Sequence, residues 1–258
     1  MNAIAAPEIA LSRKATHFIR AWDALVERSS QRWAVPASAL LHAEGERAAA
    51  VWEVTGSIQA ASESPDEAEW AQYMARVWIA TVPAAGEIVA AEYSIPKAGP
   101  PDLFMQATIN WLRLHAGDRV RGITQTSKDE IGNQIRIGVS KGEGRQEIAD
   151  RITKHRRSIT PERAVLIART EVHTAANFGS LTAVKGLNLP MRKVWLARSG
   201  ARPAHAAAGG QRQALDAAFS VGGYRMQHPG DSSHGAPAGL IANCRCVLTY
   251  EAARRRAA

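Results

Sequence analysis

Asn243-Cys244-Arg245-Cys246 lies near the end of this 258-residue chain and contains both of its cysteines. The polar, aromatic and turn-forming residues before it follow in a set order: Trp195, Arg198, Arg202, His205, Asp216, Phe219, Pro229, Gly230 and Asp231. Further upstream stands a second cluster, Ala168-Arg169-Thr170-Glu171, followed by Ala175, Ala176, Asn177 and Gly179. No single piece is decisive as a motif, so the information lies in the order of the pieces.

In that order the pieces resemble the Mu F-like family of minor head proteins from tailed bacteriophages, over about residues 118–251. The resemblance implies a virion protein that acts in head morphogenesis at or near the portal vertex and is present in the host cytoplasm during assembly. It implies no catalysis, and as partners the portal protein, capsid or scaffold proteins and packaged double-stranded DNA. It also implies a structural role for the motif residues Arg169, Glu171, Trp195, Arg202, Asp216, Asn243 and Arg245.

The composition is typical of a soluble protein with a substantial core. With 46% hydrophobic and 22% charged residues, the chain can form one large domain or two smaller ones. No window reaches the ~18 uninterrupted apolar residues of a membrane span, and residues 1–7 lack a basic leader, so no membrane partner is expected. Two cysteines separated by one residue exclude a fold-spanning disulfide framework, so stability must come from packing.

Charge is distributed unevenly along the chain. Residues 1–117 hold nine Lys/Arg against thirteen Asp/Glu, a balance of −4, whereas residues 118–258 hold twenty-three against eleven, a balance of +12. Because a basic surface gains affinity for polyanions by releasing counterions, we expect the second half to contact DNA without sequence preference and the first half to contact protein. The alternative is that the basic surface only keeps the protein soluble. The terminal Arg254, Arg255 and Arg256 are further candidates for nucleic-acid contact.

Hydrophobic periodicity and capping residues predict helical N-terminal and middle regions. Pro83 is predicted to end one helix and Gly117 to break another, and a capping box at residues 127–130 is predicted to begin the next. Thr160 is predicted to cap the N-terminus of the last helix. The expected helices span about residues 9–26, 66–83, 102–116, 127–141, 145–157 and 162–184.

The pattern changes after Gly186. Residues 192–197 and 246–250 read as strands, with the Gly- and Pro-rich run 209–239 as a loop between them. The predicted fold class is therefore α+β, mainly helical at first and with a small, loop-rich α+β module at the end. A breaker cluster at 95–101 marks the first boundary. The resulting regions are 1–101, the expected portal- or capsid-docking region, then 102–185, the module 186–251 and a basic tail 252–258.

The position of Glu171 on its predicted helix suggests burial. It shares a helix face with three small apolar residues, Ala164, Ala168 and Ala175. A buried carboxylate needs a partner, and an arginine such as Arg198 or Arg202 is the expected one. The alternative reading makes Glu171 a general acid or base. His173 is predicted to lie on a different and more polar face.

Cys244, Cys246 and His205 supply the donor types that a zinc ion takes tetrahedrally, with one of His228, Asp231 or His234 as the fourth ligand. Strand alternation predicts that both thiols lie on one face. Structural zinc is therefore a possible cofactor. Two alternatives stay open: the cysteines are small buried hydrophobes, or a polar network holds the module together through His205, Asp216, Asn243 and Arg245.

Other classes of function also fit parts of the chain. His205 with either thiol would form the nucleophile and base of a hydrolase, although no oxyanion-donor motif is apparent. Modules of this kind also occur joined to toxin domains such as ADP-ribosyltransferases or nucleases, and a non-specific DNA-binding protein is a third possibility. Six of the seven tryptophans precede Gly117; we expect most of them in the core, with anchoring of a partner as the alternative.

Overall fold

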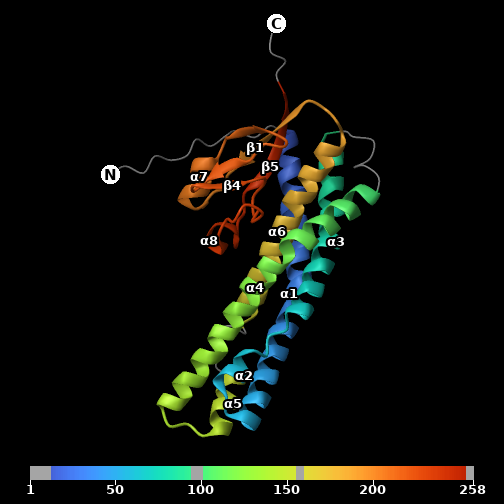
Figure 1. The fold of residues 1–258 in the computed structure, drawn as a ribbon. Helices are drawn as coiled ribbons and strands as arrows, with labels where there is room; N and C mark the ends of the chain where they lie inside the picture. Colours follow the sequence, from blue (N-terminus) through green and yellow to red (C-terminus); the bar gives the residue numbers. More distant parts are fainter. Residues whose placement is uncertain (1–12, 94–100, 155–159, 254–258) are drawn as a thin grey trace, which may run out of the picture. The chain divides into compact units, whose positions relative to one another are not determined.

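The computed structural model describes residues 13–93, 101–154 and 160–253 (Figure 1). The first six helices are α1 (Arg13–Thr55), α2 (Ile58–Ser62), α3 (Glu67–Glu92), α4 (Pro101–Ser140), α5 (Arg145–Lys154) and α6 (Pro161–Gly186). The remaining elements are β1 (Met191–Leu196), α7 (Pro203–Ala208), β2 (Arg212–Ala214), β3 (Phe219–Val221), β4 (Tyr224–Met226), α8 (Ala238–Ile241) and β5 (Val247–Ala252). The predicted α+β class, mainly helical with a small C-terminal α+β module, is confirmed.

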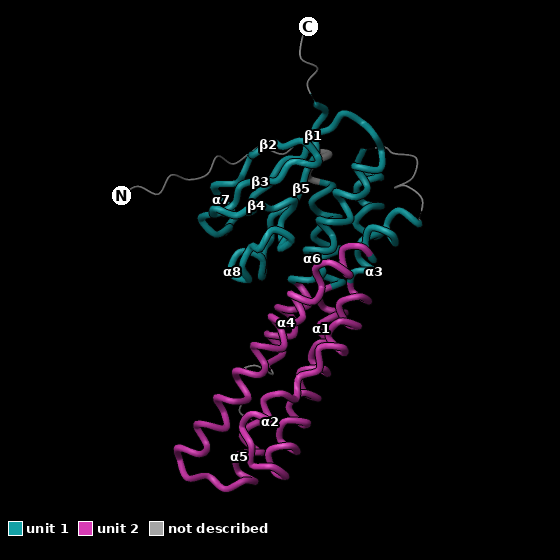
Figure 2. Tube along the Cα trace, viewed as in Figure 1, with its two compact units in different colours: residues 1–29, 78–109, 170–258 teal, residues 30–77, 110–169 magenta. Residues whose placement is uncertain are grey.

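The chain divides into two compact units (Figure 2). Unit 1 comprises the described parts of residues 1–29, 78–109 and 170–258, and unit 2 comprises those of 30–77 and 110–169. Four helices, α1, α3, α4 and α6, contribute residues to both units. The breaker cluster at 95–101 lies outside the described residues except for Pro101, where α4 begins. The region boundaries inferred from the sequence stay predictions.

Unit 2 has its own apolar core, to which α1, α2, α4 and α5 contribute. Its buried side chains are Ala48, Ala49, Trp52, Ala61, Ile131, Ile135, Ile148, Ala149 and Ile152. A buried polar pair adds to this unit, because the Nε1–H of Trp70 donates to Glu44 Oε1 at 2.6 Å. α5, which begins after Gly144, was expected from the sequence. Its buried face includes Ile148 and Ile152, which are four residues apart as expected for one face of a helix.

In unit 1 a three-stranded antiparallel sheet with the order β2-β1-β5 accompanies the helices. β1 and β5 pair over their full length, from Met191 opposite Ala252 to Leu196 opposite Val247. A separate hairpin joins β3 to β4 through Gly222-Gly223, whose φ values of 56° and 85° are those of a tight two-residue hairpin turn. The run 209–239, expected as a loop, therefore contains three short strands, because three-residue strands leave almost no periodicity to detect.

Three predicted helix boundaries are wrong, at Pro83, at Gly117 and at the expected capping box of residues 127–130. Pro83 lies inside α3, where its neighbours Val82 and Ala85 are fully buried, so packing outweighs the hydrogen bond that a proline removes. α4 runs unbroken through Gly117 and through the expected capping box. Ser127 of that box is buried within the helix, and its hydroxyl accepts a hydrogen bond from Arg163 Nη1 at 3.0 Å. The Ser127 hydroxyl therefore makes a contact between α4 and α6 and does not cap a helix.

Other terminal signals are confirmed. Thr160 Oγ1 accepts the backbone N–H of Arg163 at 3.2 Å, as an N-cap of α6 should. After α4, Gly142 adopts a φ of 73°, a conformation that favours glycine at a helix end. Helical structure also extends beyond the predicted limits in α1, because the residues after Val26 keep burying side chains such as Leu41 and Trp52.

The tryptophans are mostly core residues, as predicted. Five of the six that precede Gly117 are buried, namely Trp22, Trp52, Trp70, Trp78 and Trp111, and Trp33 is half-buried. One described helical segment, Ile58–Glu92, is long and apolar enough to cross a membrane by composition alone, and half of its apolar window is buried inside the protein. Burial of that kind is typical of a core helix in a soluble protein, and the absence of a membrane partner stays a prediction.

Candidate functional site

One face of α6 supports the C-terminal module through buried polar side chains. Thr170 Oγ1 accepts the backbone N–H of Asn243 at 3.1 Å, and Asn177 Oδ1 accepts that of Leu248 at 3.0 Å. Ser180 Oγ lies 2.8 Å from the hydroxyl oxygen of Tyr250. Thr170 and Asn177 satisfy backbone N–H groups on either side of the cysteines, and Ser180 contacts a side chain of β5, so α6 fixes the position of this segment.

The residues of α6 that contact the C-terminal module form a pattern that is visible in the sequence. Thr170, Thr174, Asn177 and Ser180 recur at intervals of three or four residues on a helix that is otherwise rich in alanine, and all four are buried. A polar stripe with helical spacing among small apolar residues indicates a buried hydrogen-bonding face.

Glu171 is buried on α6 with 3% of its surface exposed, as its alanine-lined face predicted. Ala164, Ala168 and Ala175 are buried with it. The Nε1–H of Trp78, from α3, donates to Glu171 Oε2 at 3.3 Å. This tryptophan contact is a partner that the sequence did not predict.

The arginines proposed for Glu171 make other contacts. Arg198 Nη2 lies 2.7 Å from Asp23 Oδ2, and Arg202 donates to the backbone carbonyls of Gly239 and Leu240. Arg169 is half-buried on α6.

His173 lies beside Thr174 and Asn177 on the polar face of α6, but this face is not solvated, because only 4% of the His173 surface is exposed and Asn177 Nδ2 lies 3.3 Å from its Nε2. Burial lowers the pKa of His173 to about 3, so its ring is neutral at physiological pH.

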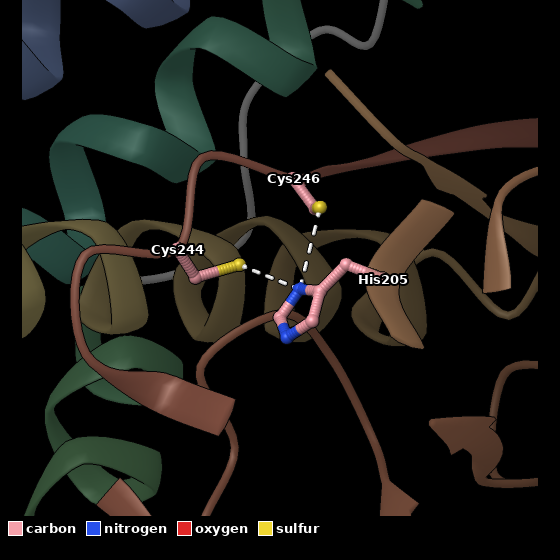
Figure 3. Close-up of side chains that lie close together, drawn as sticks. All are labelled: His205, Cys244 and Cys246. Atoms are coloured by element: carbon pink, nitrogen blue, oxygen red, sulfur yellow. Dashed lines mark hydrogen bonds between the residues drawn. The ribbon is translucent and has the colours of Figure 1, made fainter. Parts of the chain in front are cut away.

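The cysteines and His205 come together as proposed from the sequence (Figure 3). His205 lies on α7, and its Nδ1 is 3.4 Å from Cys244 Sγ and 3.5 Å from Cys246 Sγ. All three side chains are buried, and Asn243 and Arg245 are exposed, so the predicted alternation of thiols and polar residues is confirmed. The cysteines precede β5, which begins at Val247, so they lie on an extended segment before the strand.

The two thiols differ in acidity. A hydrogen bond from Cys244 lowers the pKa of Cys246 to about 5; burial opposes this shift, and His205 and the backbone N–H of Arg198 add to it. The same hydrogen bond, together with burial and the negative charge on Cys246, raises the pKa of Cys244 well above its usual value. The arrangement therefore favours one thiolate, at Cys246, that accepts hydrogen bonds from its neighbours.

Aromatic rings enclose the other side of His205. Trp195, fully buried on β1, lies edge-on to the imidazole with ring centres 5.7 Å apart and edge-on to Phe219 at 5.3 Å. Within the described part of the chain, His205 Nε2 is buried without a hydrogen-bond partner. The ring is therefore held by packing.

A pocket of about 330 Å³ opens next to the three side chains. Its lining includes both sulfur-bearing residues and His205, and it is otherwise polar or small: Arg198, Ser199, Gly200, Ala201, Arg202, Ala242, Asn243 and Arg245. The site is thus accessible from an arginine-lined side, although its donor atoms belong to buried residues.

Asp216 does not take part in the polar network with His205, Asn243 and Arg245 that the sequence left open as an alternative to zinc. Asp216 is exposed and pairs with Lys185, with its Oδ1 2.6 Å from the Lys185 Nζ, and this contact lowers the pKa of Asp216. Exposure explains the difference, because a loop carboxylate at the surface gains more from a nearby lysine than from burial beside two thiols.

The candidates for a fourth zinc ligand make contacts with residues other than the cysteines and His205. Asp231 accepts the backbone N–H groups of Gln227 at 2.6 Å and Ser233 at 2.9 Å, and His234 contacts Ser233 and Asp231. His228 Nδ1 lies 3.1 Å from the carbonyl oxygen of Pro229. Arg254, Arg255 and Arg256 lie outside the described residues.

Comparison with known proteins bears on this arrangement. Residues 129–249 match a family model described as Phage Mu protein F like protein. The matched range includes α5, α6 and the module up to Thr249, and it contains His205, Cys244 and Cys246. No match was found among curated proteins or among solved structures. Residues 129–249, slightly less than half of the chain, are therefore similar to the phage Mu F-like family, a structural family of phage head-related proteins.

Proposed function

We propose that the chain is a minor head protein that acts in head morphogenesis at or near the portal vertex and contacts packaged DNA without sequence preference. The observation that carries the DNA contact is the charge of the half that contains the matched residues, since residues 118–258 have a balance of +12 and residues 1–117 one of −4. A protein beside packaged duplex faces a dense array of phosphates, which a basic surface neutralises with release of counterions.

Exposed arginines of the module support this proposal. Arg192 on β1, Arg225 on β4 and Arg245 before β5 are exposed. Not every basic residue of the module contributes, because Lys193 is buried and its Nζ donates to Gln227, and Arg212 pairs with Glu251. The charge available for phosphate contact is therefore smaller than the sequence count suggests.

Within the residues that the structure describes, the Cys/His group lacks the third residue that orients the base in catalytic sites of this kind. A catalytic base is oriented by a third group that hydrogen-bonds its far nitrogen, as in Ser-His-Asp and Cys-His-Asn sites. Among the described residues, none forms a hydrogen bond with His205 Nε2, and the pocket is lined by arginines without a carboxylate. A binding role therefore fits the geometry better than a hydrolase or a toxin-type enzyme.

DNA affinity is expected to depend steeply on salt. Each phosphate contact contributes about 0.9 to the slope of log K against log salt, so replacing Arg192, Arg225 and Arg245 with Gln is expected to lower the slope by up to about 2.7. The measurement is a titration of the full chain with two unrelated duplexes at several salt concentrations. Both duplexes are expected to bind equally.

A second triple variant, in the acidic half, tests whether losing three positive charges anywhere in the chain has the same effect. Arg20, Arg28 and Arg76 are also exposed but belong to the acidic half, so their replacement with Gln is expected to leave the slope unchanged. Salt-insensitive binding, or equal losses in the two triple variants, would contradict DNA contact by the module. Immunoblotting of gradient-purified procapsids tests the location in the head independently of DNA.

A further inference from the structure

The three buried side chains His205, Cys244 and Cys246 form a compact donor set that the head-protein role does not use (Figure 3). We propose that they bind one zinc ion through His205 Nδ1 and the two sulfurs, with the fourth coordination position facing the arginine-lined pocket. The inference is independent of the proposed role in the head, because it depends only on the geometry of this module.

The distances fit tetrahedral zinc. Zn–S bonds of about 2.3 Å and Zn–N bonds of about 2.0 Å place sulfur and nitrogen ligands about 3.5 Å apart at a tetrahedral angle. The two N···S distances are 3.4 and 3.5 Å, and all three donor atoms lie within 4.8 Å of one another. One ion can therefore reach all three ligands with little movement of the side chains.

The charges of the donor set also suit a zinc ion. When the imidazole proton is on Nε2, His205 Nδ1 has a free lone pair that can ligate a metal. Zinc takes that lone pair and both thiolates, and two thiolates cancel the charge of the ion. A neutral assembly suits a site in which Cys244 and Cys246 are 3% and 2% exposed.

The ligands are held in place by contacts that do not involve a metal. Asn177 Nδ2 donates to the carbonyl of Cys246 at 3.4 Å, Thr170 binds the backbone N–H of Asn243, and the ring of Trp195 packs against His205. The backbone N–H of Arg198 hydrogen-bonds the Cys246 sulfur, which is a suitable outer contact for a metal-bound thiolate. The site is thus preorganised from α6, β1 and α7.

The fourth ligand differs from the one expected from the sequence. His228, Asp231 and His234 make other contacts. The pocket, in contrast, is lined by His205, Cys244 and Cys246, so the open side of the donor set faces it. Beyond the three donor residues, the described lining of the pocket contains no further His, Cys or carboxylate, the residue types that usually ligate zinc, so we assign the fourth position to a water molecule. This arrangement of three protein ligands and one open position is common for zinc.

A zinc ion here would join distant parts of the module. His205 lies on α7 and the cysteines lie just before β5, with β2, β3, β4 and α8 between them in the sequence. Those strands are three residues long, so the segment between His205 and the cysteines gains little from strand pairing alone. Binding of the metal would therefore couple to folding of the module.

The experiment measures metal in the full chain purified under reducing conditions. One zinc per chain is expected, and replacement by Co²⁺ is expected to produce the visible absorption of a tetrahedral thiolate complex. His205→Ala, Cys244→Ser and Cys246→Ser are each expected to lose stoichiometric zinc. His234→Ala, which removes an exposed histidine that the sequence offered as a ligand, is the matched control and is expected to keep it.

A second measurement on the unaltered protein keeps the proposal testable even where a variant does not fold. Removal of zinc by a chelator is expected to lower the Tm and to make both thiols react faster with an alkylating reagent, and added zinc is expected to reverse both effects. A chain that is folded and reduced, contains no zinc after zinc is supplied, and keeps its Tm in chelator would overturn the assignment. Loss of zinc in His234→Ala would overturn the ligand set.

Discussion

Gly179→Ala is expected to destabilise the protein by about 3 kcal/mol or more, at the upper end of the cost of overpacking. Gly179 lies on α6, where its backbone meets α3 at close range. A Cβ at this position would lie 2.2 Å from the carbonyl oxygen of Val82, which is backbone and cannot rotate away. One of the two helices must therefore shift, and the shift would disturb the contact of Trp78 with Phe178, whose ring centres are 5.5 Å apart.

Urea denaturation monitored by tryptophan fluorescence measures this loss. Gly122→Ala is the matched control, because Gly122 lies in α4 and a Cβ there would meet nothing within 4 Å. In an open helical position alanine is expected to stabilise by about 0.5–1 kcal/mol. Similar stability changes in the two variants would contradict the close approach of α3 and α6.

Glu171→Ala is expected to lower the free energy of unfolding by about 2–3 kcal/mol. The carboxylate is buried and accepts the Nε1–H of Trp78, so truncation leaves that indole N–H buried without its acceptor and opens a space beside three alanines. Glu171→Gln keeps an oxygen for Trp78 and is expected to cost less. Chemical denaturation of both variants provides the comparison.

Glu162→Ala is the control on the same helix. Glu162 is exposed in the first turn of α6, where its loss should cost less than about 1 kcal/mol through the helix dipole. If Glu171→Ala and Glu162→Ala unfold at the same urea concentration, the carboxylate of Glu171 contributes nothing through burial, and its contact with Trp78 of α3 is wrong.

The sequence predicted the parts of the site that depend on local rules. The N-cap at Thr160 and the burial of Glu171 followed from capping and helical spacing, and both are confirmed. Alternation predicted that Cys244 and Cys246 share one side. His205 was selected only by donor type, from a position about forty residues earlier, and its approach to the sulfurs is a result of the fold that spacing alone could not show.

The errors have a common physical origin in tertiary packing. Pro83 and Gly117 are local helix breakers, yet both lie inside long helices because the helix faces around them bury apolar side chains such as Val82 and Val120. Asp216 was grouped with His205 by residue type, but it lies at the surface beside Lys185. Signals that depend on distant partners are not visible in one sequence.

The most direct test of the central claim measures this chain in phage heads. Heads are assembled by the encoding phage with and without its portal protein, purified on a gradient, and the chain is quantified by mass spectrometry against the major capsid protein. The proposed role predicts a low, constant number of copies in heads that contain the portal and none in heads that lack it. Absence of the chain from both kinds of head would contradict a role as a minor head protein, and equal amounts in both would contradict its place at the portal vertex.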